Sequence, residues 1–316
     1  MDKNFWRNLK KPIIALAPMD GYTSSPFRRI CREMNSQIVV FTEFTSAEGT
    51  SFGAPRILER FRYHPTEQPV IAQIFGSNIP SFIKAAQYLE SLGFSGIDIN
   101  MGCPSKHVVR SEQGVALRKN HDLSFRLIEA VATHTRLPVS VKTRLGWDSA
   151  ADLTAFGRGV ESAGGNLITI HGRTYCEPYG CPADFTPIYE LKKNVKIPVI
   201  GNGGILSLPD GLQKLGNLDG FMIGQAAWGN PWIFSGRDRI AVSVDEKISV
   251  ILRHLAYGRE MKPDYFALLE MRKHVAAYLR GLPQAVRLRA ELMSTSNFDQ
   301  LEHLLGSIPA VENVKI

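Results

Sequence analysis

The sequence predicts an α/β fold, a closed (β/α)8 TIM barrel of parallel strands, followed by a small all-helical domain. Short β-branched segments alternate with helix-like segments over most of the 316 residues, as in βαβ units that build a parallel sheet. Eight such segments over roughly 250 residues match the strand count and the length of a closed barrel. The predicted strands span residues 13–18, 38–44, 70–75, 96–100, 139–143, 167–171, 199–202 and 220–223.

Polar or glycine-containing groups end nearly every predicted strand. They are Met19-Asp20, Glu43, Gln73, Asn100, Lys142, His171, Asn202 and Gly224-Gln225. An open doubly wound sheet is the alternative architecture. We favour the barrel because closure brings all of these strand ends to one mouth.

The segments between the strands carry apolar residues near helical spacing, which suits helices packed outside a barrel. These segments are 81–92, 122–133, 151–163 and 209–215. Residues 45–66 form a long charged connection, interpreted as a binding loop with a short helix at 55–60 or as a plain surface excursion.

Strand signals stop near residue 245, and the remaining chain reads as helices at 246–260, 265–280 and 284–293. We therefore predict a catalytic barrel domain over residues 1–240 and a helical domain over residues 245–316.

Composition describes an ordinary soluble protein, with 44% hydrophobic and 21% charged residues. No apolar run approaches the roughly 20 residues of a membrane span, and residues 1–11 are too polar for a secretory signal. We expect a cytoplasmic location, no membrane partner, reduced cysteines and no obligate protein partner.

The chain is basic, with a formal charge of +7 and a pI near 9.2, which favours a polyanionic partner such as nucleic acid. Basic residues gather near the C-terminus with few acids between them: Arg272, Lys273, His274, Arg280, Arg287 and Arg289.

Cys103 is the cysteine whose position in the sequence favours a reactive role. It ends the segment Gly96-Ile-Asp-Ile-Asn-Met-Gly-Cys-Pro104, directly after a predicted strand, where parallel α/β folds expose working groups. Cys31 lies in the amphipathic segment 26–34 and is expected to be a buried apolar residue. Cys176 and Cys181 are interpreted as incidental loop thiols, because no second ligand pair completes a metal site. We predict no bound metal.

Glycines follow the last two predicted strands, in Gly201-Asn-Gly-Gly204 and at Gly224. Such turns let backbone N–H groups close on a phosphate, although tight βα turns also need glycine. With Gln73 and Lys142 on other strands, the arrangement is the one expected for flavin mononucleotide, FMN. Gln73 would bond the pyrimidine edge of the flavin ring, and Lys142 would place positive charge beside it.

The chain resembles the flavin-dependent tRNA-dihydrouridine synthases over nearly its whole length. The matching motifs are Ala17-Pro-Met19, Gln73-Ile-Phe-Gly76, Asp98-Ile-Asn-Met-Gly-Cys-Pro104, Val141-Lys-Thr-Arg144, Ile170-His-Gly-Arg-Thr174, Gly201-Asn-Gly-Gly204, Gly229-Asn-Pro-Trp232, Met271-Arg-Lys-His274 and Tyr278-Leu-Arg-Gly-Leu-Pro283. The resemblance implies an oxidoreductase whose FMN barrel reduces tRNA uridines to 5,6-dihydrouridine, with NADPH as the reductant. It also implies that the helical domain helps to bind tRNA.

The expected chemistry gives Cys103 a role. Hydride added to C6 of uracil leaves negative charge that is neutralised by a proton at C5, and a mostly protonated thiol can donate that proton. The competing assignment is a thiolate that adds to C6, which requires a lowered thiol pKa. We favour the acid because the flavin already supplies the group that attacks C6.

The resemblance assigns further residues. Asn100 is expected to bond the uracil edge, and Lys142 and His171 to lie between flavin and base, whereas Arg173 contacts either the flavin phosphate or RNA. The other implied flavin contacts are Pro18, Met19, Asp20, Asn202, Gly203, Gly204, Gly224 and Gln225. Arg272, Lys273, Arg280 and Arg287 are candidate tRNA contacts. Tyr179 either stacks on a base or covers the barrel rim.

The chain departs from the family pattern at two positions. Gln225 stands where many members have arginine, which predicts weaker phosphate binding, and Val115 stands where serine is common. A small-molecule FMN oxidoreductase of the dihydroorotate or dihydropyrimidine type would share the phosphate turns and Lys142, but would leave the basic helical segment unexplained. A non-catalytic RNA-binding barrel would leave Cys103 and Lys142 unexplained.

Overall fold

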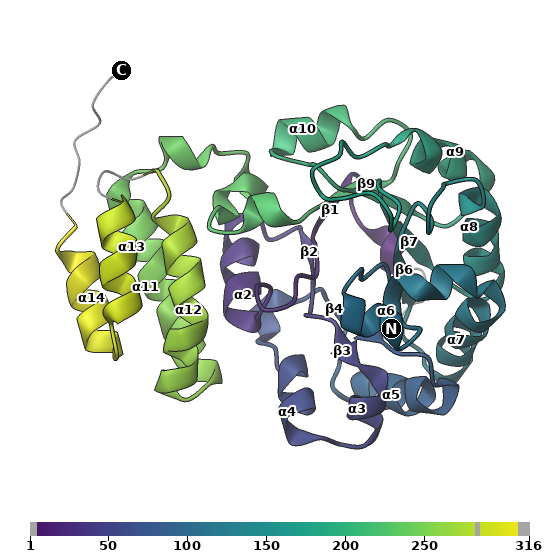
Figure 1. The fold of residues 1–316 in the computed structure, drawn as a ribbon, viewed down its shortest axis with the longest axis horizontal. Coiled ribbons are helices and arrows are strands. Elements are labelled where there is room, and N and C mark those ends of the chain that lie inside the picture. Colours follow the sequence, from purple (N-terminus) through teal and green to yellow (C-terminus); the bar gives the residue numbers. More distant parts are fainter. Residues whose placement is uncertain (1–4, 282–284, 309–316) are drawn as a thin grey trace.

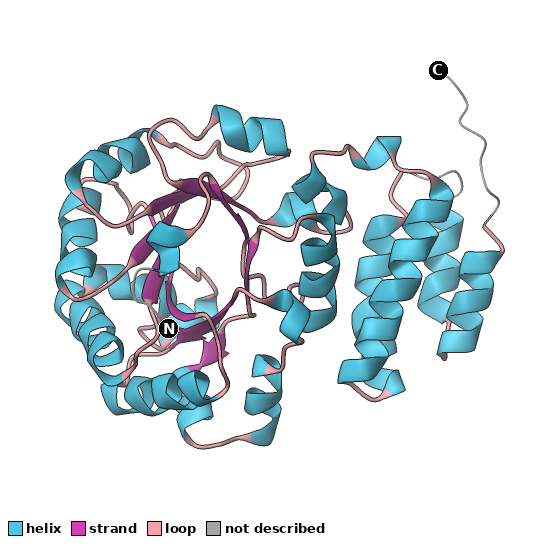
Figure 2. Ribbon diagram, turned by 180° about the vertical axis from the view of Figure 1, so that it is seen from behind, coloured by secondary structure: helices cyan, strands magenta, loops and turns pink. Residues whose placement is uncertain are grey.

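Parallel strands close into a barrel ringed by helices in the computed structural model, which describes residues 5–281 and 285–308 (Figure 2). Parts of the predicted domain ranges, the Leu282-Pro283 end of one motif and Gln284 of a predicted helix lie outside the described residues. The barrel strands are β1 (Ile13–Leu16), β2 (Val39–Phe41), β4 (Val70–Phe75), β5 (Gly96–Met101), β6 (Val139–Arg144), β7 (Leu167–His171), β8 (Val199–Asn202) and β9 (Gly220–Ile223). Each predicted strand segment overlaps one of them, so the barrel prediction is confirmed.

Hydrogen-bonded pairing runs without a break around the barrel. β9 pairs with β1 to close it, and β2 pairs directly with β4, while the short strand β3 (Thr45–Ser46) adds to the end of β4. In this register Asn100 lies beside Lys142, and His171 lies beside Asn202. Polar groups far apart in the sequence therefore stand at similar heights near the mouth.

The predicted outer helices are present, and one further helix on the outside of the barrel was not predicted. The helices that cover the barrel include α2 (Ser25–Met34), α5 (Ile79–Ser91), α7 (His121–His134), α8 (Leu153–Ser162), α9 (Thr186–Asn194) and α10 (Leu208–Gln213). Cys31 on α2 is fully buried, as expected. The missed helix, α9, buries Ile188 and Leu191 and is otherwise largely polar, which weakens its apolar periodicity.

Shorter helices occupy the connections. They are α1 (Phe5–Asn8), α3 (Ala47–Ser51), α4 (Pro55–Leu58) and α6 (Lys106–Arg110). The predicted helix at 55–60 is α4 together with the 3-10 turn Glu59–Phe61. Phe61 in that turn is buried in the barrel's core cluster, so the long connection is anchored to the barrel.

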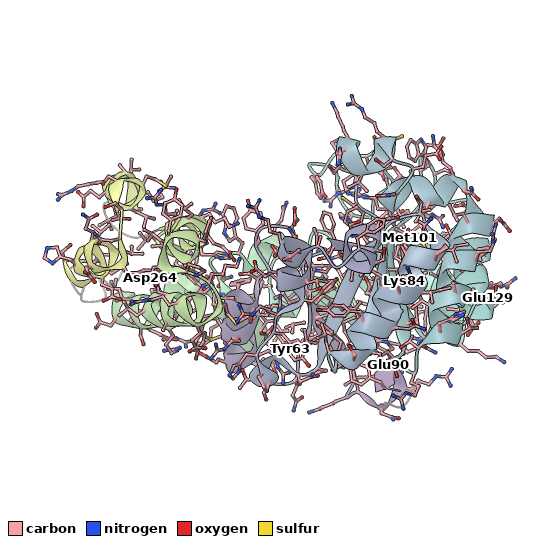
Figure 3. The ribbon with its side chains drawn as sticks, turned by 90° about the horizontal axis from the view of Figure 1, so that it is seen from below. Tyr63, Lys84, Glu90, Met101, Glu129 and Asp264 are labelled. Carbon is pink, nitrogen blue, oxygen red and sulfur yellow. The ribbon has the colours of Figure 1, made fainter. Side chains whose placement is uncertain are left out.

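A helical bundle follows the barrel and stands to one side of it (Figure 1). It consists of α11 (Val244–Met261), α12 (Asp264–Tyr278), α13 (Ala285–Ser294) and α14 (Phe298–Gly306), which share a separate apolar core. Figure 3 shows Asp264 on the bundle, away from Lys84 and Glu129 on the outer helices of the barrel. The helix α14 was not predicted. Among the described helices, none is long and apolar enough to cross a membrane.

The helix α2 joins the bundle to the barrel. Its Arg29 forms an ion pair of 2.5 Å with Glu260 of α11 and lies 3.5 Å from the ring centre of Tyr257. Glu33, one turn further along α2, pairs with Arg253 at 3.1 Å. Since these contacts come from one face of α2, that helix sets how the bundle sits against the barrel.

A buried ion pair fixes α2 to the barrel side. The Arg28 Nε atom lies 2.5 Å from Oε2 of Glu67, and both side chains are almost completely buried. The other carboxylate oxygen of Glu67 accepts hydrogen bonds from Ser25 and from the backbone N–H of His64. A charge buried this way is costly once its partner is removed.

We predict that Glu67→Ala lowers the free energy of unfolding by about 3–5 kcal/mol, because Arg28 is left buried without its counter-charge. Urea denaturation followed by circular dichroism measures this change. The control is Arg126→Ala, which removes an exposed pair with Asp122 and should cost less than about 0.5 kcal/mol. Equal effects of the two substitutions would show that the buried pair does not hold α2 in place.

Candidate active site

The carboxyl ends of the barrel strands open into a cavity of about 710 Å³, within the range of small-molecule sites. Most of the predicted site residues line it. They are Pro18, Met19, Asp20, Asn100, Cys103, Lys142, His171, Arg173, Asn202, Gly203, Gly204, Gly224, Gln225 and, from the segment after α12, Arg280. The mouth therefore brings together residues from six of the barrel strands or their following loops and one from the helical region.

Four predicted residues do not line this cavity. Gln73 lies beneath it, where its side chain accepts a hydrogen bond of 3.0 Å from the Asn100 amide. Lys273 lies near the rim, 4.9 Å from the ring centre of the cavity residue Tyr22. Arg272 bonds the carbonyl of Thr295, and Arg287 pairs with Glu291 on its own helix. These last two cations are engaged within the helical bundle.

Cys103 lies directly after β5 and is partly buried at the cavity wall. Its backbone N–H donates a bond of 2.9 Å to Oδ1 of Asn100. The loop passes so closely over Gly114 that a Cβ there would lie 2.9 Å from the Cys103 carbonyl oxygen, and Gly114 has a φ of +61°. Burial raises the pKa of the Cys103 thiol, so the sulfur keeps its proton at neutral pH.

Lys142 projects from β6 into the cavity as a half-buried cation. Its Nζ atom donates a bond of 3.0 Å to Oδ1 of Asn202, whose own amide donates to the carbonyl of Met222. Burial, followed by repulsion from Arg144, lowers the pKa of Lys142 to about 8. Lys142 therefore carries positive charge at neutral pH and loses it in mildly alkaline solution.

His171 is held as a neutral acceptor. Arg173 Nη1 lies 2.9 Å from Nε2 of His171, and since a guanidinium only donates, Nε2 must be unprotonated. Burial and the cations Lys142, Arg144 and Arg173 lower the pKa of His171 to about 2. The ring can thus donate only from Nδ1.

The glycine turn after β8 is open to the cavity. Gly203 and Gly204 have φ values of +111° and +61°, and a Cβ at Gly203 would lie 2.5 Å from the His171 ring. Arg173 stands beside this turn, since its Nη2 atom is 3.9 Å from where a Gly204 Cβ would be. Exposed backbone N–H groups beside a cation can bind an anionic group. With the half-buried cation of Lys142 in the same cavity, the residues present fit the predicted FMN.

Several cavity residues were missed as site residues, among them Arg144, Tyr22 and Trp228. Arg144 lies two positions after Lys142 on β6, so the alternation of the strand places both on one face. Its guanidinium donates to the carbonyls of Gly102 and Thr174. Tyr22 and Trp228 stack edge to face at 4.8 Å, and nothing in their local sequence marks them as neighbours.

Tyr179 and Asp20 are placed on the cavity rim. Tyr179 is 57% exposed, with its ring centre 5.9 Å from that of His171 and 5.3 Å from the Arg144 guanidinium carbon. Asp20 is ion-paired with Arg60, which comes from the long connection before β4. Both residues therefore stand at the entrance and both contact cations.

The remaining cysteines offer no second site. Cys176 is exposed, Cys181 is half-buried, and both are free thiols. In the part of the chain that the structure describes, no group of three or more His, Cys, Asp or Glu side chains is arranged to hold a metal ion.

Comparison with known proteins gives the family. The model of the dihydrouridine synthase (Dus) family matches residues 15–314. A probable tRNA-dihydrouridine synthase of Rickettsia conorii is 34% identical over 291 residues, covering 87% of each chain. The tRNA-dihydrouridine synthase B of Pseudomonas aeruginosa is 34% identical over 303 residues, covering 90% of this chain and 89% of that protein.

A solved structure with the same architecture is that of morphinone reductase. It has a TM-score of 0.51 and 10% sequence identity, and the match covers 70% of this chain and 84% of that one. This likeness concerns the barrel fold alone. The sequence relatives and the family model, each of which spans most of the chain, place this protein in the dihydrouridine synthase family.

Proposed function

We propose that the protein reduces uridine in tRNA to 5,6-dihydrouridine, with bound FMN as cofactor and NADPH as the source of electrons. The observation that carries the proposal is Cys103, a thiol that keeps its proton at neutral pH. It lines the same cavity as the Lys142 cation and the open turn at Gly203 and Gly204. Family membership supplies the reaction, and NADPH enters from the family resemblance.

Proton transfer is the step of the reaction that we assign to a side chain of this protein. Reduced FMN, when bound, supplies the hydride for C6 of the uracil. Cys103 then gives its proton to C5, which completes the saturated C5–C6 bond, and the thiolate recovers a proton from solvent. A raised thiol pKa supports this assignment over nucleophilic addition, which needs a lowered one.

The proposed cofactor contacts divide between two ends of the cavity. Gly203, Gly204 and Arg173 would hold the phosphate, and Lys142 would place positive charge at the ring system. The position of Arg173 beside the glycine turn favours phosphate over RNA as its partner. Pro18, Met19, Asp20, Asn202, Gly224 and Gln225 line the cavity and complete the proposed set, whereas Gln73 lies beneath it and supports Asn100.

The proposed uracil contacts are Asn100 and His171. The Asn100 Oδ1 atom already accepts bonds from the backbone of Gly102 and Cys103, and one amide hydrogen goes to Gln73. One N–H of Asn100 is left for an acceptor on the base. His171 would offer its Nδ1 hydrogen, because Nε2 is engaged by Arg173.

We propose that residues 1–240 carry catalysis and that residues 245–316 help to bind tRNA. Arg280 supports this division because it extends from the helical region to the catalytic cavity, where its guanidinium carbon lies 4.5 Å from the Trp228 ring centre. A cation and an aromatic face at the mouth suit a phosphate and an unstacked base. The target uridine must leave its stack to enter, which favours flexible loops of the RNA.

We predict that Cys103→Ala lowers dihydrouridine formation by about 100-fold or more, because it removes the proton donor. Nucleoside mass spectrometry of tRNA incubated with the protein and NADPH measures this loss. The flavin spectrum should persist, since the thiol is not assigned to cofactor binding. Cys176→Ser, at an exposed loop thiol, is the matched control and should keep full activity. A fully active Cys103→Ala protein would exclude the proposed acid.

A second prediction concerns the pH dependence of FMN binding. Because the pKa of Lys142 is about 8 in the folded protein, its cation is present below that pH and is lost as pH rises through it. We expect the FMN dissociation constant to rise by up to about tenfold between roughly pH 7 and pH 9, where the phosphate charge is nearly constant. Flavin fluorescence titrations measure it. Lys142→Met should bind FMN more weakly and with a flat pH profile, whereas a flat profile in the wild type would contradict the assignment.

A third prediction concerns tRNA. Arg280→Ala should weaken tRNA binding about three- to tenfold and reduce the slope of log affinity against log salt concentration by about one, because one phosphate contact is lost. Filter binding at several salt concentrations measures both. Arg126→Ala, an exposed arginine on α7 outside the barrel, should change neither. An unaltered salt slope in Arg280→Ala would remove Arg280 from the RNA surface.

A further inference from the structure

Asp98 is a fully buried carboxyl that the proposed reaction does not use. It lies in β5, two residues before Asn100, and every residue of that strand is buried. In the barrel register Asp98 is level with Gln73 on β4 and Ser140 on β6. Burial of a charged carboxyl group away from water costs free energy unless hydrogen bonds compensate it, so its partners on the neighbouring strands are informative.

Asp98 begins a chain of hydrogen bonds that ends at the Cys103 loop. Its Oδ2 atom accepts 2.7 Å from Nε2 of Gln73, and its Oδ1 atom accepts 2.6 Å from the hydroxyl of Ser140. Oε1 of Gln73 accepts 3.0 Å from the Asn100 amide. Oδ1 of Asn100 then accepts from the backbone N–H of Cys103 at 2.9 Å and of Gly102 at 3.1 Å.

Both ends of this hydrogen-bond chain require the same orientation of the Gln73 and Asn100 amides. A carboxylate only accepts hydrogen bonds and a backbone N–H only donates them, whereas each amide between them can point either way. Because the Asp98 carboxylate accepts at one end and the Cys103 N–H donates at the other, only one orientation of each amide satisfies every hydrogen bond. Reversing the Gln73 amide would force Asn100 to reverse, and its NH2 group would then face the Cys103 N–H.

Charge around Asp98 keeps the carboxylate form available. Burial raises the pKa of Asp98 to about 6, and the bonds from Ser140 and Gln73 together with the Lys142 cation on β6 oppose that rise. At neutral pH the carboxyl is therefore mostly ionised. Its two oxygens then have acceptor roles alone, as the chain requires.

We propose that Asp98 is a positioning residue whose carboxylate orients the Gln73 and Asn100 amides and thereby holds the Cys103 loop in place. The inference rests on the proposed function in treating Cys103 as the proton donor. The hydrogen-bond chain itself is independent of any substrate. Asp98 touches neither the cavity nor the thiol, and acts through two side chains that stand between them.

The test compares two substitutions of similar size. Asp98→Asn keeps an acceptor for Gln73 and can donate to the Ser140 oxygen, so the chain survives without its charge. Asp98→Leu offers no acceptor and leaves the Gln73 amide free to turn. The measurement is the rate at which iodoacetamide alkylates each cysteine of the purified full-length protein, resolved by peptide mass spectrometry. Cys176, an exposed loop thiol, is the internal reference.

We expect the Cys103 rate, relative to Cys176, to rise about three- to tenfold in Asp98→Leu, the factor that one ordinary hydrogen bond supports. Asp98→Asn should stay within about twofold of the wild type. Ser140→Ala removes the other partner of Asp98 while leaving the bond to Gln73, and should also stay close to the wild type. Equal increases in Asp98→Asn and Asp98→Leu, or none in a folded Asp98→Leu protein, would overturn the proposal.

A further variant covers the case in which Asp98→Leu does not fold. Gln73→Met removes the amide that bonds Asn100, while Asp98 keeps its hydrogen bond with Ser140. It should raise the alkylation rate of Cys103 to the same extent as Asp98→Leu. No increase in folded Gln73→Met would equally overturn the proposal. In the Asp98→Leu and Gln73→Met double variant the increases should not multiply, because both act through one chain.

Turnover separates this inference from the proposed function. With tRNA and NADPH, Asp98→Leu should lower kcat for dihydrouridine formation and leave the KM for tRNA unchanged, and Asp98→Asn should restore most of kcat. If the wild-type protein forms no dihydrouridine, the proposed function fails, and the alkylation rates still decide whether Asp98 orders the loop.

Discussion

Closure of the barrel is the constraint on which the site depends. The continuous ladder from β1 to β9 fixes the height of each strand, and one shifted register would turn each inward side chain outward. Asn100 and Lys142 become neighbours through the β5–β6 ladder, and His171 and Asn202 through the β7–β8 ladder. The pairing of the backbone therefore brings these residues together at the cavity.

Concentrated positive charge is the second property of this mouth. Lys142, Arg144 and Arg173 share a partly desolvated cavity, where burial and then repulsion from neighbouring cations lower the pKa values of Lys142 and His171. Such an arrangement is unfavourable in the empty protein and favourable once an anion enters. In the proposed reaction, negative charge that develops on the uracil would be stabilised in the same way. The positive potential that would hold the FMN phosphate would therefore also favour the proposed reduction.

The sequence was sufficient for the architecture because β-branched runs and polar strand ends are local signals. It was also sufficient for most of the cavity, since residues at strand ends must converge once the barrel closes. It was insufficient for α9, whose buried surface is small, and for the pairing of Tyr22 with Trp228, which depends on tertiary packing. For α14 the signal was present, because Phe298, Leu301 and Leu305 recur at helical spacing, and it was overlooked.

The link between the bundle and the mouth is short. Asp20 and Tyr22 line the cavity, and α2 begins three residues after Tyr22. That helix is tied to the barrel side by Arg28 and to the bundle by Arg29. On the same side of the entrance, Arg280 contacts the ring of Trp228, which packs edge to face against Tyr22. The ten-residue helix α2 and the Arg280 contact therefore join the helical bundle to the same part of the cavity entrance.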